Sequence, residues 1–248
     1  MLKRLFDILV SCIGLMLVSP ILLPVIFLVW WQDKHTPFYI ASRIGRGGVP
    51  FKMLKLRSMV INADKSGVDS TGANDKRITW IGHFIRRYKL DELSQLWNVL
   101  VGDMSLVGPR PNVKRETDLY TPVERKLLSV KPGITDFASI VFSDEGDILK
   151  EQLDPDIAYN QLIRPGKNML GLFYIENRTY LIDIKLCFLT AVAMVSRNMA
   201  LAGVQNILQA LGSPQELLRV ASRSEPLVPM PPPGGEKIVT SRDGNPFM

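Results

Sequence analysis

The sequence predicts an α+β fold that is mostly helical, with one short β-hairpin and a helical membrane segment at the N-terminus. Three observations support this class. Residues 8–31 form an apolar run without a charged side chain, apolar residues recur at helical spacing in most later segments, and two short β-type segments flank a glycine-rich turn. With 248 residues, 46% of them hydrophobic, the chain is long enough for one substantial core and a tail.

The apolar run from Ile8 to Trp31 is the first element. Its 24 residues would extend about 36 Å as a straight helix, enough to cross a hydrocarbon layer of about 30 Å. Ser19-Pro20 lies in its middle, where proline removes a backbone hydrogen bond and favours a break. Basic residues, which favour the cytoplasmic face, flank the run on both sides. A re-entrant helix over residues 1–33, broken at Ser19-Pro20, fits both facts; a kinked single-pass span is the alternative.

The predicted hairpin follows the membrane run. Phe38-Tyr39-Ile40 and Phe51-Lys52-Met53-Leu54 are typical of short strands, and Gly45-Arg46-Gly47-Gly48 between them is typical of a tight turn. The same glycine-rich turn could contact a phosphate. Residues 62–76 are polar and rich in small side chains, which predicts a surface loop.

Helical periodicity predicts most of the remaining elements. Apolar residues between Thr79 and Tyr88 lie on one stripe, a second helix begins at Asp91, and Gly102 ends it. The further expectations, in chain order, are a short helix over 122–129, a tight turn over 131–135, a helix from Asp154 that ends at Pro165-Gly166, and helices over 184–195 and 201–211.

These elements divide the chain into four parts. Residues 1–33 are the membrane anchor, residues 34–200 the main domain, and residues 201–221 a helical extension. Residues 222–248 are rich in proline and glycine, a composition that predicts disorder.

Charge and composition exclude several classes of protein. The net charge of +6 indicates an anionic partner, such as a lipid headgroup, a phosphorylated substrate or nucleic acid. Cys12 and Cys187 lie in apolar surroundings, and His35 and His83 are isolated. A disulfide framework, a zinc site and a multi-histidine metal centre are therefore not indicated.

The carboxylate pair Asp91-Glu92 is the first candidate for chemistry. It opens a predicted helix, where unpaired N–H groups favour an anion, although acidic residues are also common there as helix caps. The preceding stretch from Lys34 to Lys89 holds twelve basic and three acidic residues, an excess of nine positive charges. This excess beside a membrane segment favours anionic headgroups or a diphosphate, although part of it also fits a solvated face.

Arg110 is the second candidate. Pro109 and Pro111 fix the backbone on both sides and hold the guanidinium in place at little entropic cost. Its planar group suits bidentate binding of phosphate or of a nucleobase edge, and the alternative is an arginine that stabilises a turn.

These motifs resemble the signature of the bacterial sugar transferases, the monotopic phosphoglycosyl transferases that act on polyprenyl phosphate. The resemblance covers roughly residues 1–195, and it includes the helix break at Ser19-Pro20. The other matching blocks are Phe51 to Met59, Leu90-Asp91-Glu92-Leu93, Gln95 to Leu100, Gly102-Asp103-Met104-Ser105, Val107-Gly108-Pro109-Arg110-Pro111, Lys131 to Thr135 and Leu181 to Lys185.

The resemblance implies a mechanism and roles for named residues. Asp91 is expected to be a nucleophile that attacks the β-phosphorus of a UDP-sugar, releases UMP and passes the phosphosugar to undecaprenyl phosphate. Asp91 and Glu92 are expected to hold Mg²⁺, and Glu92 could alternatively assist proton transfer. The expected ligands of phosphate or uridine are Lys55, Arg57, Arg86 and the Pro109-Arg110-Pro111 segment.

The resemblance also implies partners and a location. The main domain would be catalytic and lie on the cytoplasmic face of the bacterial inner membrane, with UDP-sugar, undecaprenyl phosphate and membrane lipid as partners, no nucleic acid, and a homodimer as in family members. Two rivals are a membrane-anchored basic binding protein, whose carboxylates are structural, and a membrane acyltransferase or lipid phosphatase. The isolated histidines disfavour the second rival.

Two positions depart from the family pattern. Ser94 stands where many members have proline, and Asp136-Phe137-Ala138-Ser139 follows Thr135 where many have glycine. The second departure bears on sugar recognition. Two interpretations of the cluster Asp144-Glu145-Gly146-Asp147 therefore stay open: a solvated turn, or part of a metal or sugar site.

Overall fold

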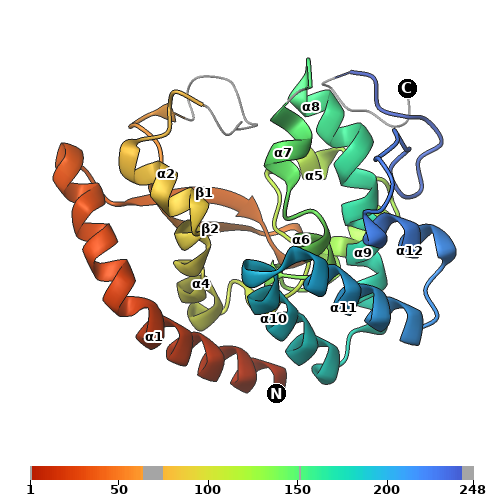
Figure 1. Cartoon of the computed structure of the whole chain (residues 1–248), viewed down its shortest axis with the longest axis horizontal. Helices are drawn as coiled ribbons and strands as arrows, with labels where there is room; N and C mark the ends of the chain where they lie inside the picture. Colours follow the sequence, from red (N-terminus) through yellow and green to blue (C-terminus); the bar gives the residue numbers. More distant parts are fainter. Residues whose placement is uncertain (1, 64–74, 151, 242–248) are drawn as a thin grey trace.

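Helices make up most of the protein, and they surround two small sheets in the computed structural model (Figure 1). The structure describes residues 2–63, 75–150 and 152–241. Most of the expected loop over residues 62–76 lies outside these ranges. The helices are α1 (Leu2–Asp33), α2 (Trp80–Arg87), α3 (Leu90–Leu93), α4 (Leu96–Val101), α5 (Lys114–Asp118), α6 (Phe137–Val141), α7 (Glu145–Lys150), α8 (Pro155–Ala158), α9 (Arg164–Asn177), α10 (Tyr180–Val195), α11 (Arg197–Ala210) and α12 (Gln215–Ser222), with 3₁₀-helices η1 (Arg46–Gly48) and η3 (Glu124–Ser129) and the π-helix η4 (Tyr159–Ile163).

The predicted hairpin is confirmed and is longer than expected. Strand β1 (Phe38–Ile44) pairs antiparallel with β2 (Pro50–Leu56), so that Phe38 lies opposite Leu56. Gly47 and Gly48 in the connecting turn have φ values of 70° and 77°, which only glycine adopts without strain.

A second sheet was not expected from the sequence. Strand β3 (Ser105–Val107) pairs in parallel with β4 (Gly133–Thr135). The prediction of a tight turn over residues 131–135 is therefore wrong in its second half. With three residues each, these strands are too short to show an alternating pattern.

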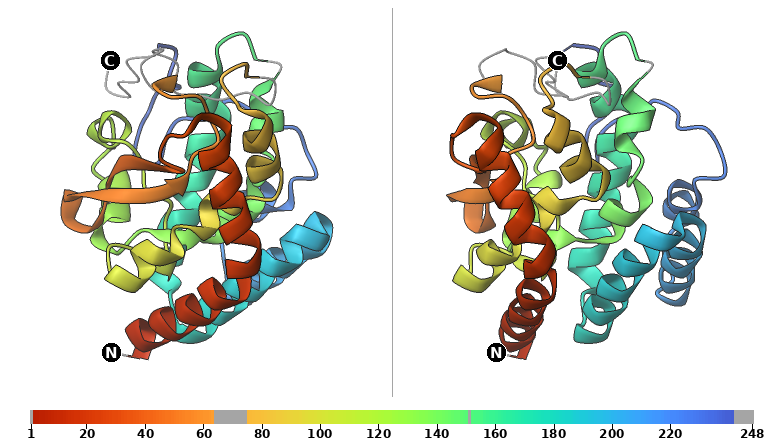
Figure 2. Two further views of the ribbon diagram at one scale, coloured as in Figure 1. Left: turned by 90° about the vertical axis from the view of Figure 1, so that its left-hand side faces the viewer. Right: turned by 60° about the vertical axis from the view of Figure 1, so that its left-hand side comes forward.

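Helix α1 is one continuous helix with Pro20 and Pro24 inside it. It bends part-way along its length, and the expected break is therefore a bend within the helix (Figure 2). Pro20 has no N–H for the carbonyl of Met16, and the Ser19 hydroxyl donates to that carbonyl at 2.8 Å instead. Among the described residues, α1 is the helix that is long and apolar enough to cross a membrane by length and composition.

Both ends of α1 are attached to the main domain. Near the N-terminus, Lys3 pairs with Asp183 of α10 at 2.5 Å, and the buried Asp7 accepts from the Ser105 hydroxyl at 2.9 Å. At the other end, Asp33 accepts two hydrogen bonds from the buried Arg57, at 2.6 and 2.7 Å. The helix therefore follows the domain surface along its length (Figures 1 and 2).

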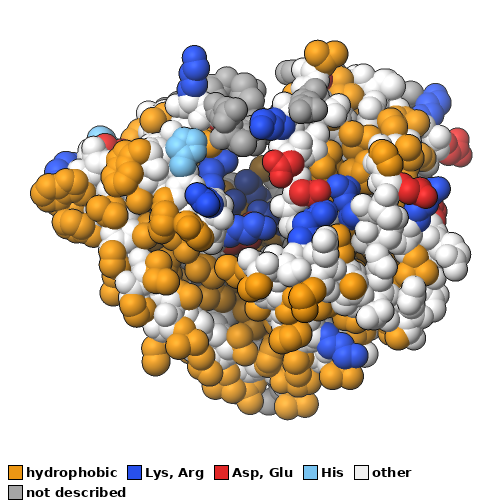
Figure 3. Space-filling model, in the orientation of Figure 1, with side chains coloured by type: hydrophobic (Ala, Val, Ile, Leu, Met, Phe, Trp, Pro, Cys, Tyr) orange, Lys and Arg blue, Asp and Glu red, His pale blue; other side chains and the backbone are white. Residues whose placement is uncertain are grey.

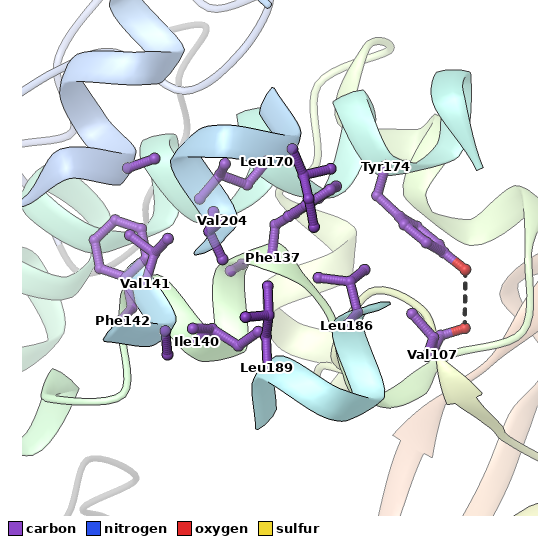
Figure 4. Packing of buried hydrophobic residues seen from close by; sticks show 14 of the residues in the cluster. Val107, Phe137, Ile140, Val141, Phe142, Leu170, Tyr174, Leu186, Leu189 and Val204 are labelled. Carbon is purple, nitrogen blue, oxygen red and sulfur yellow. Dashed lines mark hydrogen bonds between the residues drawn. The ribbon is translucent and has the colours of Figure 1, made fainter. Parts of the chain in front are cut away.

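The main core surrounds α6, against which α9, α10 and α11 pack (Figure 4). Phe137 is fully buried at its centre among Leu170, Leu186 and Val204. The Tyr174 hydroxyl lies 3.2 Å from the carbonyl of Val107 and thereby links α9 to β3. The core thus holds the end of β3 rigidly, and the Pro109-Arg110-Pro111 segment begins there.

The helices predicted after residue 120 are confirmed as helical segments, but one predicted helix end is wrong. The sequence predicted a helix end at Pro165-Gly166, but both residues lie in the first turn of α9, which follows η4 without interruption. Proline is tolerated in a first helical turn because the N–H it lacks has no partner there.

The Pro/Gly-rich tail has no helix or strand beyond Ser222 in its described part, which ends at Ser241. It nevertheless contacts the domain rather than lying free as expected. Met230 donates to the carbonyl of Gln161 at 3.0 Å, the Gln161 amide donates to the carbonyl of Val239 at 2.7 Å, and Val239 is buried. We call residues 223–241 the C-terminal strap.

Candidate functional site

The site begins at the turn between α2 and α3. Lys89 has a φ of 51° and a ψ of 32°, and this left-handed residue redirects the chain so that α3 starts at Leu90. Leu90 is buried and anchors the turn, while Asp91 and Glu92 occupy the first helical turn as expected. Two adjacent carboxylates therefore follow directly after Lys89, a residue with a strained backbone conformation.

Side chains of α3 and α4 tie this segment to strand β2. Asn98 accepts from the N–H of Leu54 at 2.8 Å and donates to the carbonyl of Lys52 at 2.7 Å. The Ser94 hydroxyl lies 2.8 Å from the carbonyl of Asp91 and 3.1 Å from that of Leu54. Ser94 therefore makes contacts that proline could not make, and the next strand residue, Lys55, lies close to the carboxylates.

Arg110 reaches the same place from strand β3. A Cβ on Gly133 would lie 2.1 Å from the backbone nitrogen of Gly108, so the two segments approach as closely as glycine allows. Gly133 donates to the carbonyl of Pro109 at 3.0 Å and holds the segment in position. The Arg110 guanidinium then pairs with Glu92 at 2.9 Å.

The two carboxylates have different surroundings. Burial alone would raise the pKa of Glu92, but Arg110 and Lys89 outweigh burial and hold the pKa below its ordinary value. Burial raises the pKa of Asp91, although Lys55 acts against this shift. In the described part of the chain, the Asp91 carboxylate makes no hydrogen bond or ion pair. Glu92 is thus ionised and already paired with Arg110, whereas the Asp91 carboxylate is available to contact a substrate.

Two of the expected phosphate-binding cations lie beside Asp91. Burial lowers the pKa of Lys55 to about 8, and the charge of Arg110 adds to this effect. Burial also lowers the pKa of Arg86, whose Nε donates to the Ser58 hydroxyl at 3.0 Å and whose charge acts on Asp91. The cost of burying these cations is reduced when an anion binds between them.

The structure does not bring Arg57 to this site. Its guanidinium is buried and donates to Asp33, to the carbonyl of Thr36 at 2.8 Å and to that of Val29 at 3.3 Å. Because these bonds use its donors to join β2 to α1, the expectation that Arg57 binds phosphate is corrected to a structural role. Sequence alone did not separate Lys55 from Arg57 because the two residues are two positions apart at the end of the same predicted strand.

The site opens to the surface as a hollow. Figure 3 shows it between α2 and α7, with Lys and Arg side chains over its floor and acidic side chains on the rim toward α7. Long apolar side chains are exposed along α1, among them Leu17, Phe27 and Trp31, and on α10. The hollow therefore lies on a molecule with an extensive exposed apolar surface.

Few side chains of the site could coordinate a metal ion. Within the described ranges, no group of three His, Cys, Asp or Glu side chains could hold an ion. Asp91 and Glu92 are two carboxylates on one helical turn, which fits Mg²⁺, because this ion is commonly bound by one or two carboxylates together with substrate phosphates and water.

The open question of the acidic cluster is partly answered by its partners. Asp144 forms an ion pair with Arg197 at 3.0 Å and accepts a hydrogen bond from Arg223 of the strap at 2.8 Å, which is a structural arrangement. Glu145 pairs with Lys167 and its charge acts on Arg110. Lys167 was not singled out from the sequence, where it is one lysine in a predicted helix break.

Comparison with known proteins gives matches over most of the chain. Residues 1–197 match the family model described as bacterial sugar transferase. Over 192 residues, 76% of this chain, the sequence is 38% identical to a UDP-glucose:undecaprenyl-phosphate glucose-1-phosphate transferase of Klebsiella pneumoniae. It is 42% identical over 149 residues, 54% of this chain, to a UDP-galactose-lipid carrier transferase of Erwinia amylovora.

A third relative is the undecaprenyl-phosphate galactose phosphotransferase of Salmonella typhimurium, 35% identical in an alignment of 215 positions that covers 79% of this chain. The matched regions cover 39%, 31% and 41% of these three relatives, respectively, so the chain corresponds to less than half of each.

Proposed function

The chain belongs to the bacterial sugar transferase family, and on that premise we propose that it transfers a sugar 1-phosphate from a UDP-sugar to undecaprenyl phosphate. The relatives are named for this reaction with glucose or galactose donors. The product would be a polyprenyl-diphosphate sugar, the first membrane intermediate of a glycoconjugate such as a capsule, an O-antigen or an exopolysaccharide. The observation that carries the proposal is the available Asp91 carboxylate amid Lys55, Arg86 and Arg110.

Asp91 is the nucleophile in this proposal. Its carboxylate oxygen attacks the β-phosphorus of the donor, the bond from that phosphorus to the bridging oxygen breaks, and UMP leaves. A terminal oxygen of undecaprenyl phosphate then attacks the same phosphorus, and the bond to Asp91 breaks. Burial supports this role, because a carboxylate with a raised pKa is more basic and more nucleophilic than one in water.

The neighbouring groups stabilise charge during both steps. The positive charges of Lys55, Arg86 and Arg110 act on Asp91, where the phosphoryl oxygens would gather negative charge, and contacts with Ser58 and Glu92 hold Arg86 and Arg110 in place before substrate arrives. The lowered pKa of Glu92 keeps it ionised near neutral pH, so it suits a metal ligand better than a proton donor. Mg²⁺ held by Asp91 and Glu92 would supply further neutralisation of the diphosphate.

The membrane placement belongs to the same proposal. We infer a re-entrant helix because Lys3 near one end of α1 and Asp33 at the other both pair with the main domain. A helix of 32 residues, about 48 Å long, whose two ends are tied to one domain can enter the membrane and return. The domain would then lie on the cytoplasmic face, with the hollow at headgroup depth and a homodimer as its assembly.

The activity is tested with purified protein, Mg²⁺, undecaprenyl phosphate and a panel of UDP-sugars. UMP release that depends on the lipid phosphate is the expected result. Asp91→Asn and Asp91→Ala should reduce turnover by at least about a thousandfold while membrane insertion is unchanged. If either variant turned over at the wild-type rate, Asp91 would not be the nucleophile.

The topology is tested by labelling a cysteine placed at residue 2 in intact cells, in a background in which the native Cys12 and Cys187 are replaced by serine. The re-entrant arrangement predicts that only a membrane-permeant reagent reacts. Labelling by an impermeant reagent added outside would instead support a full span.

A further inference from the structure

A second group of polar side chains lies next to Arg110, beyond the carboxylate pair. We call it the far-wall cluster: Asp136, Glu145, Lys167, Tyr159 and Glu116. Acidic and basic side chains gather on the rim of the hollow toward α7, as Figure 3 shows. The proposed reaction uses none of these five residues.

The sheet topology places this cluster beside the phosphate-binding segment. Strands β3 and β4 are parallel, and the N–H of Gly108 donates to the carbonyl of Thr135 at 3.0 Å. Arg110 and Asp136 therefore follow the carboxyl ends of two neighbouring parallel strands. In α/β proteins, ligands commonly bind at this edge of a parallel sheet.

Asp136 is the most informative member of the cluster. The residue is only 2% exposed, and its Oδ1 accepts from both the N–H and the hydroxyl of Ser139 at 2.7 Å, which caps α6. Its Oδ2 has no hydrogen-bond partner in the described part of the chain and lies in the field of Lys167 and Arg110. This second oxygen of a nearly buried carboxylate, close to two cations of the hollow, is free to accept a hydrogen bond from a ligand.

Lys167 and its neighbours form the rest of the wall. Lys167 pairs with Glu145, and its Nζ lies 5.3 Å from the centre of the Tyr159 ring. Tyr159 opens the π-helix η4, an irregular element that often occurs at functional sites. Glu116 faces Lys167 and Arg43 of the hairpin, and burial raises its pKa.

We propose that the far-wall cluster binds the sugar ring of the donor and selects among UDP-hexoses through hydrogen bonds to the ring hydroxyls. This inference rests on the proposed function, because it assumes a nucleotide-sugar donor whose diphosphate lies between Lys55 and Arg110. Asp136 and Glu145 accept from hydroxyl groups, Lys167 donates to them, and Tyr159 offers an apolar face to the ring.

The chemistry of the cluster favours a sugar over the other parts of the substrate. Its three carboxylates would repel a second phosphate. A uracil ring has a single N–H donor, too few for several acceptors, whereas a hexose ring carries several hydroxyl donors. A site built to hydrogen-bond a hydroxyl also rejects the analogue that lacks it, which is the basis of selection among epimers.

The test compares Asp136→Asn and Lys167→Met with two matched controls, Asp118→Asn and Lys114→Met, at an exposed ion pair on α5. Asparagine is a good helix cap, so Asp136→Asn retains the cap of α6 and the fold. For each protein we would measure thermal unfolding, the affinity for UMP, and kcat/KM for a panel of UDP-hexoses.

The far-wall variants should lower kcat/KM for the preferred donor by about tenfold or more, the factor expected for a lost hydrogen bond to a charged group. Their affinity for UMP should stay within about twofold of wild type, and their preference between epimeric donors should weaken. If the far-wall variants kept the wild-type preference between epimeric donors, the inference would be overturned. If their affinity for UMP fell as much as their kcat/KM, the cluster would bind the nucleoside and not the sugar. If the wild-type protein releases UMP from no donor, the proposed function itself fails.

Discussion

The partly buried cation Lys55 provides a quantitative prediction. Its pKa of about 8, against an ordinary 10.5, means that folding disfavours the charged form. At about 1.4 kcal/mol for each pH unit, this amounts to roughly 3 kcal/mol. The unfolded chain binds the extra proton between pH 8 and 10.5, so the contribution of Lys55 to stability rises with pH across that window and is most unfavourable below pH 8.

Replacement of Lys55 by methionine removes this cost and keeps the volume. The Lys55→Met protein should therefore melt higher than wild type at pH 7, by several degrees and at most about 10 °C, while it loses affinity for UDP. Lys52→Met is the matched control, because Lys52 lies on the same strand with an exposed side chain. The assays are thermal unfolding in detergent and calorimetric titration with UDP.

The wild-type protein gives a second readout of the same prediction. Because only the charged lysine attracts phosphate, the affinity for UDP should fall about tenfold between pH 7 and pH 9, in proportion to the charged fraction. A flat affinity over this range, or a Lys55→Met protein that melts below wild type at pH 7, would refute this reasoning.

Three further predictions follow from the supporting structure. Gly133→Ala would place a Cβ 2.1 Å from the backbone nitrogen of Gly108 and should sharply lower the yield of folded protein. Gly146→Ala is the control, because a Cβ there has no other atom within 4 Å. Expression yield and melting temperature would be measured for both variants. Arg57→Met removes hydrogen bonds to the partly exposed Asp33 on α1 and should cost about 1.5–3 kcal/mol of stability, the range for a hydrogen bond to a charged group. The KM for UDP-sugar should be unchanged in the folded fraction, and a raised KM would show that Arg57 does contribute to the site. Deletion of residues 223–248 should lower the melting temperature by several degrees, because it removes the hydrogen bonds of the strap to Gln161.

Much of the site could be predicted because local patterns determine it. The N-terminal position of Asp91 and Glu92 in a helix follows from apolar spacing after Leu90. The single helix predicted from Asp91 to Gly102 is two short helices, α3 and α4, and Gly102 ends the second with a φ of 100°. The hairpin follows from its glycine turn. Arg110 pairs with Glu92 and the charge of Arg86 acts on Asp91, while the binding of phosphate or uridine by these arginines stays a prediction.

Other parts depend on contacts between distant segments, which local patterns do not contain. The β3–β4 pairing requires the close approach of Gly108 and Gly133, 25 positions apart in the sequence. Arg57 and Lys55 differ only in the partner that folding provides, Asp33 in one case and the carboxylate pair in the other.

The tail and the helix at Pro165 show the limits of composition. Proline and glycine rule out regular structure, but they do not prevent the strap from hydrogen-bonding to η4 through Gln161. Pro165 in a first helical turn is locally indistinguishable from a proline that ends a helix, and the preceding π-helix resolves the choice only in three dimensions.

The most direct test of the account is to trap the covalent intermediate. Protein would be incubated with Mg²⁺ and a UDP-sugar labelled in the sugar, without polyprenyl phosphate, then quenched in acid and mapped by peptide. We predict about one label per chain on the peptide that contains Asp91, its absence in Asp91→Asn, and its release when undecaprenyl phosphate is added before the quench. Full product formation with no label ever attached to the protein would contradict the account.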